Sequence, residues 1–94
     1  MDHPNELIER LRGEEASLQE RIERLEREAK HPYQGVRQYR CHRVSQLRQR
    51  QYTLRDRIRR VEAHAHEWEA VRPEAERLYL DLKETHALAE RTFH

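Results

Sequence analysis

Apolar residues recur in alternating steps of three and four along most of this 94-residue chain. This spacing places them on one stripe of an α-helix and follows the seven-residue repeat of coiled coils. The pattern therefore predicts an all-α fold of long helices with narrow apolar seams. In a first helix over about residues 4–30, the predicted seam is Ile8, Leu11, Leu18, Ile22, Leu25 and Ala29, with Glu15 as its one polar defect.

The stretch His-Pro-Tyr-Gln-Gly at residues 31–35 interrupts the repeat. Pro32 biases the preceding residue away from helix, and a connection this short between helices predicts an antiparallel coiled-coil hairpin. A second helix is expected over about residues 36–71. Antiparallel pairing of the two seams brings Leu18 level with Gln51 and Glu15 level with Leu54, and its midpoint falls inside the turn.

A third helical segment is expected over about residues 73–92, after Pro73, and the whole chain (1–94) is expected to form a single helical domain. The repeat runs through Pro73 without a skip, which favours one long helix with a kink. The local bias of Pro73, and the benefit of bringing an acidic segment beside a basic one, favour a fold-back into a three-helix bundle, which is the alternative to the preferred kinked helix. Uninterrupted, the repeat gives this segment the seam Ala75, Tyr79, Leu82, His86, Ala89 and Phe93.

Charge is strongly segregated, although 39% of the residues are charged and the net charge is only +1. Residues 31–60 hold nine arginines against one acid, a net charge of +8, whereas residues 1–30 and 61–94 carry −3 and −4. An arginine stripe of this kind can follow a phosphate backbone. The nearly neutral total instead favours neutralisation of the stripe by the two acidic segments, because dedicated nucleic-acid-binding domains are usually basic overall.

The turn and the start of the second helix combine arginines with tyrosines. Such a basic tip can dock on an acidic protein surface, or grip phosphates and stack bases. A solvated basic turn, with two tyrosines closing the end of the core, is the alternative without a partner. The predicted partner-binding residues of this tip are Tyr33, Arg37, Tyr39, Arg40 and Arg43.

A thin apolar core also favours self-association. Residues 68–93 carry the widest apolar surface of the chain, so a homodimer is expected to form there. The predicted interface residues are Trp68, Val71, Leu78, Tyr79, Leu82 and Phe93.

No catalytic residue, metal or cofactor is predicted. His64 and His66 are two residues apart and point to different sides of a helix, so they cannot chelate one ion from the same helix. Cys41 and His42 also diverge, and a helical hairpin offers little concavity for an active site. A metalloprotein with histidine and carboxylate ligands remains a third, unfavoured alternative.

The first residues lack the apolar core of a signal peptide, and no stretch approaches the roughly 18 apolar residues of a membrane span. A single cysteine fits a reducing compartment, so a soluble cytoplasmic protein is expected. The sequence thus predicts a non-catalytic helical adaptor, assembly or regulatory protein that acts through protein–protein contacts and self-associates. A nucleic-acid-binding hairpin is the alternative.

Overall fold

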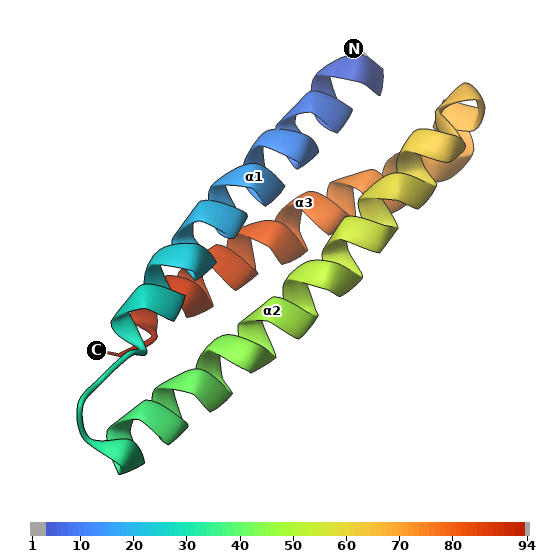
Figure 1. Ribbon diagram of the computed structural model, residues 1–94. Helices are drawn as coiled ribbons and strands as arrows, with labels where there is room; N and C mark the ends of the chain where they lie inside the picture. Colours follow the sequence, from blue (N-terminus) through green and yellow to red (C-terminus); the bar gives the residue numbers. More distant parts are fainter. Residues whose placement is uncertain (1–3, 94) are drawn as a thin grey trace.

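The computed structural model describes residues 4–93, which form three long helices that pack side by side, with the middle helix antiparallel to the other two (Figure 1). They are α1 (Pro4–Glu28), α2 (Gln34–Ala63) and α3 (Trp68–Arg91), with a short 3₁₀ helix (Ala65–Glu67) between α2 and α3. The bundle measures 51 × 18 × 15 Å. The chain's C-terminal end lies beside the α1–α2 turn, so three segments meet at that end (Figure 1).

The seams predicted for the first two helices form the core. Leu11, Leu18 and Ile22 of α1 are fully buried, and Leu54, Ile58 and Val61 of α2 are nearly so. Pro4 opens α1 at the position where a missing N–H costs nothing. The turn comes slightly earlier than expected, since α1 ends at Glu28 and Gly35 already lies in the first turn of α2.

The third helix folds back, so the three-helix bundle is confirmed and the favoured kinked helix is wrong. The chain leaves α2 at Ala63 rather than near Val71, and Pro73 lies inside α3. The length of α1 explains the early reversal. With Val61 paired near Ile8, a longer α2 would pass the start of α1 at Pro4 and have nothing to pack against.

The seam of α3 differs from the uninterrupted repeat. The buried residues are Ala75, Leu78, Leu82, Thr85, Ala89 and Thr92, whereas the expected Tyr79, His86 and Phe93 are only partly buried. Three of the predicted seam residues stay buried, and the other three are replaced by the residues that precede them in the sequence. The change occurs because α3 packs against both α1 and α2 instead of continuing α2. Within residues 4–93, no helix is long and apolar enough to span a membrane.

Candidate functional site

The five predicted tip residues lie together at the end of the bundle where α1 turns into α2. Tyr33 and Tyr39 are 72% and 63% exposed, and the Tyr33 ring stacks on the imidazole of His31 with centroids 5.4 Å apart. These tyrosines therefore do not close the core. Phe93, which arrives from the end of α3, packs against the core instead.

Arg40 ties the three segments together at this end. Its guanidinium lies 4.9 Å from the centroid of the Phe93 ring, and its Nη1 donates to the backbone carbonyl of Glu28 at 2.9 Å. That carbonyl belongs to the last turn of α1, where the helix itself supplies no donor. Arg40 is thus partly engaged in holding the fold. Phe93 was not expected at the tip, although a fold-back of α3 would have brought it there.

The other tip cations have weak partners or none. Arg37 Nη1 donates to the His31 carbonyl at a long 3.4 Å. Among residues 4–93, no carboxylate forms an ion pair with Arg37, Arg40 or Arg43. The N-terminus of α2 adds to this positive charge, because its first turn contains no acid and no side chain caps it.

Four arginines in the middle of α2 are neutralised by the two acidic helices. Arg55 pairs with Glu15 of α1 at 2.8 Å, and Arg50 lies 3.6 Å from Glu84 of α3. The four arginines are paired as follows: Arg48 with Glu26, Arg50 with Glu84, Arg55 with Glu15, and Arg57 with both Glu74 and Asp81. Beyond them, Arg59 lies 3.8 Å from Asp56 of its own helix, and Arg60 forms no ion pair within residues 4–93.

Arg57 is the most firmly held of these side chains. Its Nε donates to Glu74 at 2.9 Å and its Nη1 donates to Asp81 at 2.7 Å. Burial lowers the pKa of Arg57, but the hydrogen bonds to Asp81 and Glu74 outweigh it and raise that pKa overall. The arginine stripe expected from the sequence is therefore divided into a paired body over residues 48–57, an unpaired tip, and two exposed arginines, Arg59 and Arg60, near the other end of α2.

The polar defects of the seam form a buried layer in the paired body. Gln51 is fully buried, and its Nε2 donates to Glu15 at 3.0 Å and to Gln19. Its Oε1 accepts from Arg48 at 2.9 Å. Arg55 binds Glu15 and Gln19 from the other side. This layer agrees with the predicted pairing of the two helices.

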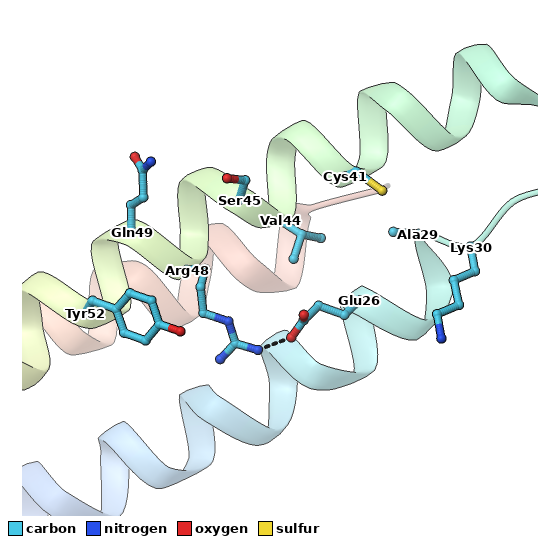
Figure 2. A pocket seen from close by; sticks show the side chains of 9 residues that line it. All are labelled: Glu26, Ala29, Lys30, Cys41, Val44, Ser45, Arg48, Gln49 and Tyr52. Carbon is cyan, nitrogen blue, oxygen red and sulfur yellow. Dashed lines mark hydrogen bonds and ion pairs between the residues drawn. The ribbon is translucent and has the colours of Figure 1, made fainter.

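Two grooves border α2 near the tip. The larger, of about 500 Å³, runs between the end of α1 and α2. Figure 2 shows Cys41 and Val44 facing Ala29 across it, with the Glu26–Arg48 pair bridging the two helices beside them. The smaller, of about 240 Å³, lies between α2 and α3 and is lined by Arg43, Gln46, Leu47, Arg50, Leu88 and Thr92.

The residues predicted to form a dimer interface on α3 differ in how deeply they are buried within their own chain. Leu78 and Leu82 are fully buried within their own chain. Trp68, Tyr79 and Phe93 pack against the same core, and Val71 is also partly buried. Most of the apolar surface of α3 is therefore already covered by α1 and α2, which was not foreseen because the seam was assumed to run on unchanged.

The histidines of the described chain form no metal-ligand cluster. Within residues 4–93, no group of three His, Cys, Asp or Glu side chains is arranged to hold an ion. The partly buried His86 has a structural partner, since its Nε2 lies 3.0 Å from the carbonyl oxygen of Glu14 and 3.4 Å from that residue's carboxylate. No protein-family model, curated protein or solved structure matches the chain.

Proposed function

We propose that this chain is a non-catalytic helical adaptor, assembly or regulatory protein that binds an acidic surface of another protein through its basic tip. The observation that carries the proposal is the division of the α2 arginines. Arg48, Arg50, Arg55 and Arg57 are neutralised by α1 and α3, whereas Arg37 and Arg43 at the tip have no carboxylate partner within residues 4–93. Arg60 also has none, but it lacks the exposed tyrosines and the helix N-terminus that accompany the tip arginines.

An acidic segment suits this site in charge and in shape. Carboxylates would meet the unpaired guanidinium groups and the uncapped positive end of α2. Tyr33 and Tyr39 add large, rigid side chains that bury area on binding at a low cost in conformational entropy. The exposed thiol of Cys41 agrees with a reducing cytoplasm as the place of action.

Nucleic acid is the second candidate, since exposed tyrosines among arginines can stack on bases. The pairing of four body arginines argues against it. A phosphate backbone following α2 would have to compete with Glu15, Glu74 and Asp81 for those side chains.

The two candidates are separable by fluorescence anisotropy with labelled poly-L-glutamate and labelled oligothymidine as probes. We expect poly-L-glutamate to bind, and Arg37→Gln/Arg43→Gln to weaken its binding about tenfold or more. The matched control is Arg59→Gln/Arg60→Gln, which removes the same charge from exposed positions near the other end of α2.

Equal losses for the two double variants would mean that the tip is not a site and would contradict the proposal. Tighter binding of oligothymidine, falling steeply as salt is raised, would favour the nucleic-acid candidate.

A further inference from the structure

The outward face of α2 over residues 38–53 is almost free of charge, in a chain of which 39% is charged. Arg43 is the one formally charged residue among its ten exposed residues, and Arg50, whose side chain is 41% exposed, lies at its edge in an ion pair with Glu84. The exposed positions of α1 and α3 are instead mostly glutamate, arginine and lysine. We call this surface the neutral face. Its residues are Gln38, Tyr39, Cys41, His42, Arg43, Ser45, Gln46, Gln49, Tyr52 and Thr53.

The composition of the neutral face is that of an interface. Cores of protein–protein interfaces are depleted of Lys and Glu and enriched in Tyr and Arg. Tyr39 and Tyr52 are 63% and 50% exposed near the two ends of the face. The larger groove opens beside it, since Cys41, Ser45, Gln49 and Tyr52 line that groove, together with the apolar Ala29 and Val44 (Figure 2).

The chemistry of the neutral face suits a second copy of the same chain. In a closed homodimer the same patch meets itself, so a patch of one charge sign repels its own copy. Amide and hydroxyl side chains both donate and accept hydrogen bonds, and are complementary to themselves. A nucleic acid or an acidic protein would instead be recognised by cations, of which this face holds only Arg43.

We propose that two copies of this chain dock through their neutral faces, with the two α2 helices antiparallel and a two-fold axis near Ser45. Gln38, His42, Ser45, Gln49 and Tyr52 follow one another in steps of four and three, the spacing of a helix–helix seam. Centred in this way, Tyr39 of one copy is level with Tyr52 of the other.

Electrostatics selects the antiparallel arrangement. Parallel α2 helices would bring two basic tips side by side, and their unpaired arginines would repel. In the antiparallel dimer the two Arg37 residues are offset by 17 residues along the helix, or about 26 Å, which is about three times the screening length of about 8 Å at physiological salt. The two Arg43 residues are offset by only 5 residues, or about 8 Å, so their repulsion is only partly screened and weakens the dimer.

The size of the neutral face sets the strength of the dimer. Its ten exposed residues are about half or fewer of the 20–30 residues per side of a standard stable interface. The dimer is therefore weak and reversible. Dimerisation does not depend on the proposed acidic partner. Tyr39 and Arg43 belong to both the basic tip and the neutral face, so in the dimer an acidic partner would meet mainly Tyr33 and Arg37 of each tip.

The first test is the mass of the full chain, measured by sedimentation equilibrium up to about 1 mM, a concentration that detects dimers of only about −4 kcal/mol. We expect a rise from monomer to dimer. Gln46→Glu places like charges near the two-fold axis and should raise the dissociation constant about tenfold or more. The control Ala87→Glu adds the same charge to an exposed site on α3 and should leave the dissociation constant unchanged.

A chain that stays monomeric throughout this range would overturn the proposal, as would equal effects of Gln46→Glu and Ala87→Glu. Helix content measured by circular dichroism separates either outcome from unfolding. If the full chain forms the dimer but does not bind poly-L-glutamate, the proposed function is wrong and the dimer proposal still stands.

Disulfide trapping tests the direction of the helices, in a Cys41→Ser background. Ser45→Cys lies near the two-fold axis and should oxidise to a covalent dimer. Gln38→Cys lies about 22 Å from its own copy in the antiparallel dimer, far beyond the roughly 7 Å between Cα atoms that a disulfide spans. Efficient trapping through Gln38→Cys would show a parallel dimer and refute the arrangement.

Discussion

Gln51 shows how a single residue fixes the alignment of this bundle. It is fully buried in an apolar seam, yet each of its amide atoms has a partner on α1 or α2. A buried polar side chain of this kind specifies register in coiled coils at some cost in stability. Because Glu15 and Gln19 also bind Arg55, they keep a donor when Gln51 is removed.

Two substitutions at Gln51 should therefore differ. We expect Gln51→Leu to stay within about 1 kcal/mol of the wild-type free energy of unfolding, since it fills the space and leaves no partner unsatisfied. Gln51→Ala opens a cavity and should cost about 2–3 kcal/mol. Urea denaturation followed by circular dichroism measures both, and equal costs would mean that the hydrogen bonds, rather than the volume, matter most.

The Arg12–Glu62 pair predicts a dependence of stability on pH. Arg12 donates to the Glu62 carboxylate through Nε at 2.9 Å and Nη2 at 2.6 Å, and this hydrogen bonding lowers the pKa of Glu62. The unfolded chain therefore takes up the proton first. The stabilisation is fully present above about pH 4.3, the ordinary glutamate value, and is lost as the pH falls below it.

Glu62→Gln should lower the midpoint of thermal unfolding by about 3 °C at pH 7, and by much less near about pH 3. Glu20→Gln is the control, because Glu20 is exposed and makes no ion pair within residues 4–93. A deficit in Glu62→Gln that is as large near pH 3 as at pH 7 would rule out the ion pair as its cause.

At the scale of the helices, the sequence predicted α1, the hairpin and the seam of α2. Those residues show an uninterrupted repeat on both sides of a turn marked by Pro32. The α2–α3 reversal was placed wrongly because residues 64–67 contain no Gly, Pro or Asn. Leu82 was expected in the seam, but the burial of Leu78 in place of Tyr79 depends on all three helices together, so local preferences could not reveal it.

Pro73 tests this explanation of the reversal. It is the sixth residue of α3, where its ring removes one backbone hydrogen bond. We expect Pro73→Ala to raise the free energy of unfolding by roughly 2 kcal/mol and to keep the bundle, because the length of α1 sets where α2 ends. Small-angle scattering of the dilute chain should keep a radius of gyration near 15.5 Å, and a clearly larger value would indicate one continuous helix.

For the whole molecule, the important property is where its positive charge remains unpaired. The segregation of charge along the chain was readable from the sequence, and it correctly indicated that the acidic helices would neutralise α2. The sequence did not indicate how far that neutralisation extends. It stops short of the tip because Arg37, Arg40 and Arg43 lie where α1 ends, and the end of α3 brings Phe93 and Thr92 rather than an acid.

The most direct test is an NMR titration of the arginine Nε–Hε signals with poly-L-glutamate. We predict that the signals of Arg37 and Arg43 move strongly, Arg40 less so, and that Arg55 and Arg57 stay in place because their carboxylate partners hold them. Movement of Arg55 and Arg57 together with the tip arginines would show that the body is not neutralised. That result would contradict the account on which the proposed binding site depends.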